Sequence, residues 1–179
     1  PTVDDIPERF SITKGRIKLL VMGNLKTGGS GCICPESVLL KSLTSEILLR
    51  QSEVVIMDMD AGVEHLYRGT AQAVDAFVIV VEPGQRSLQT ARSIRTLARN
   101  LGIEQCLLVG SKTRDEAQRR FILDNMPDFE VLGFINYNPA VAEADLRGTG
   151  VYDAAPEAVR EAEGIKAAME AAIRPSAGR

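Results

Sequence analysis

The order of elements in this chain is decided by residues 77–110, which read FVIVVEPGQRSLQTARSIRTLARNLGIEQCLLVG. Apolar runs at residues 77–82 and 105–110 have no polar face, which is typical of strands buried on both sides of a parallel sheet. Between them, apolar residues recur at helical spacing over residues 87–101, with Ser87 as the expected N-cap. This order of strand, helix and strand predicts a right-handed crossover between parallel neighbours.

The same alternation extends on both sides of this unit. Apolar runs at residues 17–23 and 53–59 predict two earlier buried strands, and residues 35–50 have the apolar stripe of a helix. A weaker strand is predicted at residues 131–135 and a closing amphipathic helix at residues 158–172. The predicted fold class is therefore α/β, with a doubly wound, mostly parallel sheet flanked by helices.

Composition excludes several classes of protein. The 179 residues carry a formal net charge of -3, so no basic surplus is available to neutralise the phosphates of a nucleic acid. No apolar run reaches the roughly 18 residues that span a bilayer, and no signal peptide pattern is present. We expect one domain over residues 1–179, ending in a flexible tail at residues 174–179. We also expect a cytoplasmic protein without nucleic acid or membrane partners.

Two of the three cysteines, Cys32 and Cys34, lie in the sequence GGSGCICPE, between a glycine-rich loop and a helix start at Pro35. The partial positive charge of a helix terminus favours the thiolate, which is the form that binds metal. A closed site needs four ligands, and Cys106 is expected to be a core residue of an apolar strand. If two copies of the chain meet at this loop, four sulfurs could hold zinc or nickel. The alternatives are a redox dithiol and two small residues that fill a turn.

Asp58 stands at the carboxyl end of a predicted strand and is followed by the sequence MDAG, which ends at Gly62. Ligands of open α/β sheets collect at that edge. A carboxylate there can hold magnesium through water, and Gly62 allows a backbone N–H to approach a terminal phosphate, as in nucleotide hydrolases. The alternative interpretation is a solvated turn.

The phosphate-binding loop expected beside such a strand is incomplete. Residues 23–30, GNLKTGGS, match the spacing of Gly-x-x-x-x-Gly-Lys-Ser except that Gly29 replaces the lysine. Without this lysine, the charge that would face the β- and γ-phosphates is lost, and the following helix is delayed to Pro35. This stretch is therefore not expected to bind phosphate.

Four stretches together resemble a known family. They are VMG at residues 21–23, GGSGCICPE at 28–36, DMDAGVEH at 58–65, and VEP at 81–83 with Arg86 and Ser87. With these motifs the chain resembles the accessory ATPases that help mature nickel-containing carbon monoxide dehydrogenase, a branch of the MinD, ParA and nitrogenase iron protein superfamily of P-loop NTPases. In that family a deviant Walker A loop, Lys-Gly-Gly-x-Gly-Lys-Ser/Thr, precedes a region similar to the one that opens at Pro1. The chain thus resembles the C-terminal major part of such an ATPase domain, without its first strand and phosphate loop.

The resemblance implies an ATP-dependent metallochaperone that assists nickel insertion into carbon monoxide dehydrogenase or another nickel enzyme. It implies ATP with magnesium as cofactor and a homodimer that shares nickel or zinc between Cys32 and Cys34 of each copy. It also implies a catalytic aspartate at Asp58, and with Gly62 this makes the predicted catalytic pair. Because the phosphate loop is absent, the 179-residue chain alone is expected to be inactive as an ATPase. The alternative function is a MinD- or ParA-like partitioning or positioning ATPase without a metal.

Recognition of the base in that family uses an Asn-Lys pair after a late strand and a segment near a Pro-x-Asp turn. Here the first position holds Ser111 and Lys112, and the second holds Asn138 and Pro139 in the sequence NYNP. Both depart from the family pattern, and serine has a shorter reach than asparagine and a single donor. The resemblance therefore predicts cofactor contacts at these four residues, with Lys112 along the plane of the base.

Overall fold

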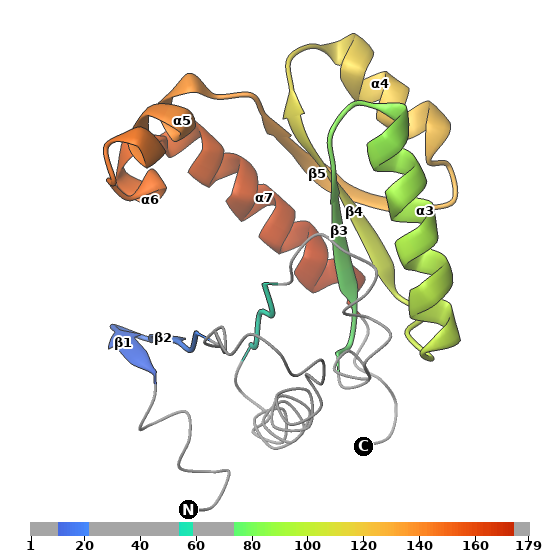
Figure 1. The fold of residues 1–179 in the computed structure, drawn as a ribbon, viewed down its shortest axis with the longest axis horizontal. Coiled ribbons are helices and arrows are strands. Elements are labelled where there is room, and N and C mark those ends of the chain that lie inside the picture. Colours follow the sequence, from blue (N-terminus) through green and yellow to red (C-terminus); the bar gives the residue numbers. More distant parts are fainter. Residues whose placement is uncertain (1–10, 22–53, 59–73, 174–179) are drawn as a thin grey trace, which may run out of the picture. The chain divides into compact units, whose positions relative to one another are not determined.

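The computed structural model of the chain describes residues 11–21, 54–58 and 74–173 (Figure 1). They belong to two compact units, Pro1–Ala73 and Val74–Arg179. The predicted helix at residues 35–50 lies outside the described residues, as do three predicted site residues: Cys32, Cys34 and Gly62. The described elements of the second unit contain the predicted crossover.

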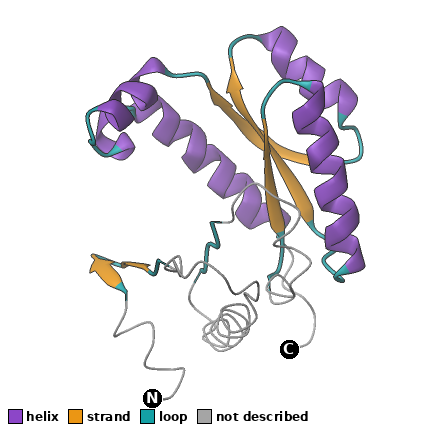
Figure 2. Cartoon of the chain, viewed as in Figure 1, coloured by secondary structure: helices purple, strands orange, loops and turns teal. Residues whose placement is uncertain are grey.

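A three-stranded parallel sheet lies at the centre of the second unit (Figure 2). Its strands, in spatial order, are β3 (Phe77–Val81), β4 (Cys106–Thr113) and β5 (Glu130–Asn136). The crossovers are α3 (Gln85–Asn100), between β3 and β4, and α4 (Glu116–Asn125), between β4 and β5. The three strands predicted in this part of the chain and their parallel arrangement are confirmed, since β3 pairs with β4, and β4 with β5, in the parallel sense.

Helices cover both faces of this sheet (Figure 1). On one face, α7 (Pro156–Ala172) packs against the apolar side chains of Leu107, Val109 and Leu132. On the other face lie α3 and α4, and an ideal Cβ on Gly110 would be 3.2 Å from Cδ1 of Ile122 in α4. Because helices cover both faces, the first five residues of β4, Cys106 to Gly110, are all buried and none of them is polar.

The start of α3 differs from the prediction that Ser87 is its N-cap. Gly84 holds that position, without a side-chain hydrogen bond, and the helix begins at Gln85. The Ser87 hydroxyl instead accepts a hydrogen bond from the backbone N–H of Glu82, at an N–Oγ distance of 3.0 Å. The predicted cap was wrong because this side chain reaches back beyond the helix start to satisfy an N–H of the preceding loop.

Three helices of the second unit were not predicted from the sequence: α4, α5 (Pro139–Leu146) and α6 (Val151–Ala154). Two side chains cap the start of α4. The N-cap Asp115 accepts from the N–H of Gln118 at 2.8 Å, and the Gln118 amide oxygen accepts from the N–H of Arg114, one residue before the cap, at 2.9 Å. Asn138 caps α5 by accepting from the N–H of Ala140 at 2.9 Å. Both signals are present in the sequence as Asp-x-x-Gln and Asn-Pro.

In the first unit, the described residues correct two predicted strands. Of the strand predicted at residues 17–23, β2 (Ile17–Leu19) is confirmed as a strand. Its predicted burial in a parallel sheet is wrong, because β2 forms an exposed antiparallel hairpin with β1 (Ile12–Lys14). Gly15, at φ +61°, allows the tight turn that makes this local pairing available. Residues 54–58, within the strand predicted at 53–59, form no strand in the structure.

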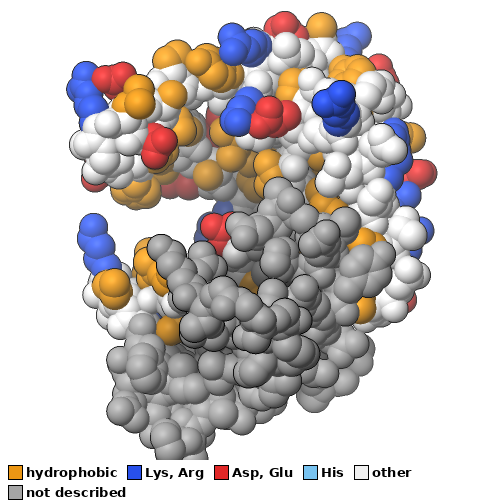
Figure 3. All heavy atoms as spheres, viewed as in Figure 1, with side chains coloured by type: hydrophobic (Ala, Val, Ile, Leu, Met, Phe, Trp, Pro, Cys, Tyr) orange, Lys and Arg blue, Asp and Glu red, His pale blue; other side chains and the backbone are white. Residues whose placement is uncertain are grey.

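The surface of the described residues is mixed in charge. Figure 3 shows acidic and basic side chains near one another over the drawn face of the second unit. Along single helices, Glu143 pairs with Arg147 at 2.6 Å and Lys166 pairs with Glu170 at 2.7 Å. Within the described ranges, none of the helices combines the length and apolarity that crossing a bilayer requires.

Candidate functional site

The candidate site lies where β3, β4 and β5 end. Because the strands are parallel, their carboxyl ends meet at one edge of the sheet, which is the edge where open α/β folds bind ligands. Glu82 follows β3, Lys112 lies near the end of β4, and Tyr137 follows β5. This edge therefore brings together the two regions in which base contacts were predicted.

Lys112 has an unusual backbone conformation at this edge. Its φ is +55°, in the left-handed region, and the register between β4 and β5 shifts between Ser111 and Thr113. A non-glycine residue in this region costs on the order of 1 kcal/mol, and such positions concentrate at functional sites. The bulge turns the Lys112 side chain toward β3, where Nζ lies 2.6 Å from Oε1 of Glu82. Both side chains are exposed, so this ion pair leaves Lys112 available to a ligand.

An arginine and a tyrosine stack beside Lys112. The guanidinium carbon of Arg114 lies 4.0 Å from the ring centroid of Tyr137, and 44% of Tyr137 is exposed. The backbone N–H of Tyr137 donates to the carbonyl of Thr113 at 2.9 Å, which continues the pairing of β4 and β5 beyond the last strand residue. Sequence reasoning missed this pair, because no spacing rule connects positions 114 and 137.

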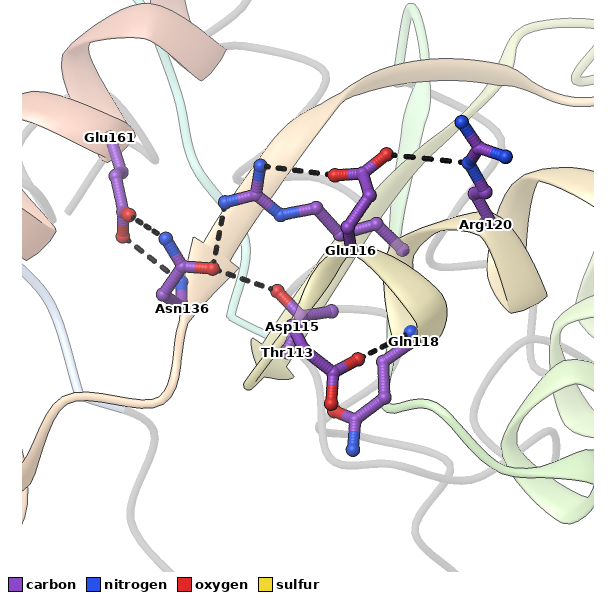
Figure 4. Close-up of polar contacts among 8 residues, drawn as sticks. Thr113, Asp115, Glu116, Gln118, Arg120, Asn136 and Glu161 are labelled. Atoms are coloured by element: carbon purple, nitrogen blue, oxygen red, sulfur yellow. Dashed lines mark hydrogen bonds and ion pairs between the residues drawn. The ribbon is translucent and has the colours of Figure 1, made fainter.

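Asn136, the last residue of β5, is the centre of a hydrogen-bond network (Figure 4). Its Oδ1 accepts from the hydroxyl of Thr113 at 3.0 Å and from Nη2 of Arg119 at 2.9 Å. Its backbone N–H and its Nδ2 donate to the two carboxylate oxygens of Glu161 in α7, at 3.0 and 2.5 Å. One amide thereby joins β4, α4, β5 and α7 at the carboxyl edge of the sheet.

A hollow of about 440 Å³ opens next to this network, and Asn136, Glu157, Arg160 and Glu161 line it. Glu116 extends the network outward, since it pairs with Arg119 at 3.9 Å and with Arg120 at 3.8 Å. Asn136 opens the NYNP segment in which base contacts were predicted, whereas the charged residues of this network were not predicted from the sequence as part of a site.

The structure brings four predicted cofactor-binding residues to one edge. Ser111 and Lys112 lie at the end of β4, and Asn138 and Pro139 form the start of α5 directly after β5. The Asn138 side-chain oxygen caps α5, which places its amide group at a helix start rather than free in solvent. Asp58 is exposed in the first unit.

Of the three cysteines, only Cys106 lies within the described residues. Cys106 lies in β4 with 9% of its surface exposed, and burial raises the pKa of its thiol, although the charges of Arg95 and Arg99 oppose this effect. The burial of Cys106 confirms the prediction that it is a core residue, and a thiol with a raised pKa is a poor metal ligand. Within residues 11–21, 54–58 and 74–173, no three His, Cys, Asp or Glu side chains are grouped closely enough to hold a metal. Cys32 and Cys34 lie outside these ranges.

One sequence comparison decides the family. The chain is 44% identical over 178 residues to the carbon monoxide dehydrogenase accessory protein CooC of Rhodospirillum rubrum, a match that covers 99% of this chain and 68% of that protein. The chain belongs to the CooC family. The resemblance that the four sequence motifs indicated is thereby confirmed, although no protein-family model matches this CooC-family chain.

Two further relatives are proteins of Methanocaldococcus jannaschii, both named uncharacterized ATP-binding proteins. One is 41% identical over 150 residues, which cover 83% of the CooC-family chain and 58% of that protein. The other is 31% identical over 147 residues, which cover 82% of the chain and 58% of that protein. The chain therefore spans less than two thirds of the length of these archaeal relatives.

Solved structures share the fold. The MinC:MinD cell division protein complex of Aquifex aeolicus contains a chain with a TM-score of 0.62 and 18% identity, over 80% of this chain and 62% of that one. The MinD cell division protein of the same organism also has a TM-score of 0.62, with 15% identity over 78% of this chain and 62% of that one. At these identities the similarity concerns the fold alone. It confirms that the CooC-family chain has the predicted α/β fold, which it shares with MinD.

Proposed function

We propose that the protein is an ATP-dependent maturation factor that assists nickel insertion into carbon monoxide dehydrogenase. The observation that carries this proposal is its 44% identity to CooC, a carbon monoxide dehydrogenase accessory protein, over nearly the whole chain. Nickel is the cargo, and carbon monoxide dehydrogenase or another nickel enzyme is the client. The chain supplies the C-terminal major part of a single MinD- or ParA-like ATPase domain.

Cys32 and Cys34 are the proposed cargo site. Two thiolates from each of two copies of the chain give four sulfur ligands, which suits zinc in a tetrahedral site or nickel in a planar one. The positive end of the helix predicted to begin at Pro35 favours the thiolate form of the pair. A homodimer is therefore part of the proposal, and so is a reducing compartment such as the cytoplasm, which keeps the thiols available.

ATP with magnesium is the proposed cofactor, and two relatives have ATP binding in their names. Asp58 would hold the magnesium ion through water, and the N–H of Gly62 would face the terminal phosphate. The base would lie at the carboxyl edge of the second unit, where the Lys112 side chain offers an apolar stem and a charged end. The proposed base contacts are Ser111, Lys112, Asn138 and Pro139.

Coupling between nucleotide and cargo follows from the shared site. One copy of the chain offers only two of the four thiolates, so metal affinity depends on how closely two copies approach each other. ATP favours the closed dimer in this proposal, and the closed dimer binds the metal more tightly than separate chains do. Hydrolysis then returns the chains to the open state and weakens the metal site, which releases the cargo to the client.

The 179-residue chain by itself is expected to release no phosphate from ATP. Its GNLKTGGS stretch at residues 23–30 has Gly29 where a phosphate loop has its lysine, so the charge that stabilises the transferred phosphate is missing. Phosphate release is measured on a sample shown to be folded by circular dichroism, with the Asp58→Ala variant as the background. A longer gene product in which a Lys-Gly-Gly-x-Gly-Lys-Ser/Thr loop precedes Pro1 is expected to hydrolyse ATP.

Phosphate release from the 179-residue chain above its Asp58→Ala background would contradict this prediction. A full gene product that neither binds nor hydrolyses ATP would contradict the proposed function itself.

A second candidate function is a MinD- or ParA-like positioning ATPase without a metal, and the TM-score of 0.62 to MinD favours considering it. Such proteins act on membranes or DNA and need an apolar or a continuous basic surface. The charges on the face drawn in Figure 3 are of both signs, and α7 carries Glu157, Glu161, Glu163 and Glu170 against Arg160 and Lys166. These observations support the metallochaperone over the positioning ATPase.

A further inference from the structure

We propose that Asn136 and Glu161 form a positioning pair that fixes the base-contact segment and sets the selectivity for adenine over guanine nucleotides. The pair rests on the proposed function, because it acts on the predicted base contacts at Lys112 and Asn138. Neither residue is itself proposed to touch the base. The proposal is based on two hydrogen bonds: the backbone N–H and the side-chain Nδ2 of Asn136 both donate to the carboxylate of Glu161.

Glu161 holds the end of β5 by two charge-assisted bonds. The backbone N–H of Asn136 lies 3.0 Å from Oε2, and Nδ2 lies 2.5 Å from Oε1. Hydrogen bonds to an ionised carboxylate are shorter and stronger than neutral ones, and both groups are half-buried, which reduces competition from water. α7 therefore fixes the backbone at the residue immediately before the base-contact segment.

The other side of the same amide fixes the end of β4. Oδ1 of Asn136 accepts from Thr113, whose side chain is fully buried, and from Arg119 of α4. Thr113 directly follows Lys112, the residue in the left-handed conformation. One amide group thus connects the strand end that carries Lys112 with the strand end that leads to Asn138, which are the two halves of the predicted base site.

Hydrogen bonds restrict the two residues that connect Asn136 to the base-contact residues. The N–H of Tyr137 donates to the carbonyl of Thr113 at 2.9 Å, and Asn138 then caps α5 through its bond from Ala140. A shift of Asn136 is therefore transmitted to Asn138 and Pro139 instead of being absorbed by a loose loop. Adenine and guanine carry different hydrogen-bond donors and acceptors on one ring edge. A segment fixed in position can therefore pair with the polar groups of adenine and leave those of guanine without partners.

The test uses three variants of the full gene product: Asn136→Asp, Glu161→Gln, and both together. Asn136→Asp replaces the Nδ2 donor by an oxygen that faces the Glu161 carboxylate. Glu161→Gln removes the charge and leaves only one acceptor for two donors. The double variant exchanges carboxylate and amide between the two positions, so donor, acceptor and net charge are all restored. Glu170→Gln is the matched control, since Glu170 lies in the same helix as Glu161 but pairs with Lys166 instead of Asn136.

The readout is the ratio of the dissociation constants of non-hydrolysable GTP and ATP analogues with magnesium, measured by calorimetry beside the melting temperature. Each single variant is expected to lower this ratio by about tenfold. The double variant is expected to return to within about threefold of the wild type, and Glu170→Gln to leave the ratio unchanged. Glu161→Gln keeps the neutral partner Asn136, so it decides the question even where Asn136→Asp does not fold.

Two results would overturn the positioning pair. One is a melting temperature that falls in the single variants while the ratio stays at the wild-type value, which is the behaviour of a merely structural bond. The other is a double variant whose ratio remains as low as that of the singles. A wild-type protein that binds neither analogue is a different result, because it removes the proposed function on which the pair rests.

Discussion

Replacing Gly110 with valine is expected to lower the free energy of unfolding by roughly 3 kcal/mol. Gly110 in β4 lies directly opposite Phe134 in β5, and a Cβ at this position would be 2.3 Å from Cδ1 of Phe134. The phenyl ring therefore occupies the space that a side chain at position 110 would need. The same Cβ would be 3.2 Å from Cδ1 of Ile122 in α4, so the methyl groups of valine have no free volume to enter.

Urea unfolding of the full gene product measures this change. The matched control is Gly164→Ala in α7, where a Cβ would have nothing within 4 Å. Alanine in a helix interior is more favourable than glycine, so this control is expected to gain about 0.5 to 1 kcal/mol. Equal unfolding free energies for Gly110→Val and the wild type would show that the packing of Phe134 against β4 is not as described.

Replacing Cys32 and Cys34 together with serine is expected to reduce bound metal from about one ion per two chains to background. A serine hydroxyl is not deprotonated at neutral pH and is a poor ligand for nickel or zinc, so the shared site loses all four donors at once. Gel filtration of the full gene product with an ATP analogue, followed by elemental analysis of the dimer fraction, measures the stoichiometry.

Cys106→Ala is the control for this measurement. Its side chain is buried in β4 and burial raises its pKa, so its removal is expected to leave the metal content unchanged. Unchanged metal in the Cys32→Ser, Cys34→Ser variant would remove the shared site and favour the MinD- or ParA-like positioning ATPase.

The crossover from β3 through α3 to β4 could be predicted because its pattern is local and strong. Strands buried on both faces give continuous apolar runs, and α3 presents Leu88, Ala91 and Ala98 to the sheet at helical spacing. The boundaries were less certain, since β4 continues to Thr113, three residues beyond the predicted end at Gly110. The polar residues Ser111 and Lys112 interrupt the apolar pattern although the strand pairing continues.

The sequence of the hairpin β1 and β2 shows the limit of an apolar run as a signal. Ile17 and Leu19 are 73% and 56% exposed, although their run has the composition of a buried strand. Composition indicates that a segment can form a strand. Whether the strand is parallel or antiparallel, and whether it is buried, depends on the neighbour with which it pairs. Here the nearest partner along the chain, β1, takes that place.

The polar network at the carboxyl edge could not be predicted, for a different reason. Asn136 and Glu161 are 25 residues apart, and Asn136 and Arg119 are 17 apart, so neither pair follows a helix or strand period. They meet only because α7 and α4 pack on opposite faces of the same sheet. The resemblance to a family predicted that ATP binds at the carboxyl edge of the sheet. The residues that fix the strand ends at this edge could not be predicted, because their contacts depend on how the helices of this chain pack.

The most direct test of the proposed function is the activation of nickel-free carbon monoxide dehydrogenase by the purified full gene product. With nickel and ATP, the wild-type protein is expected to raise the activity of the dehydrogenase, and the Cys32→Ser, Cys34→Ser variant is not. A non-hydrolysable ATP analogue is expected to prevent the activation, because hydrolysis releases the metal. Equal activation by the wild-type protein, the double-serine variant and nickel alone would contradict the proposed function.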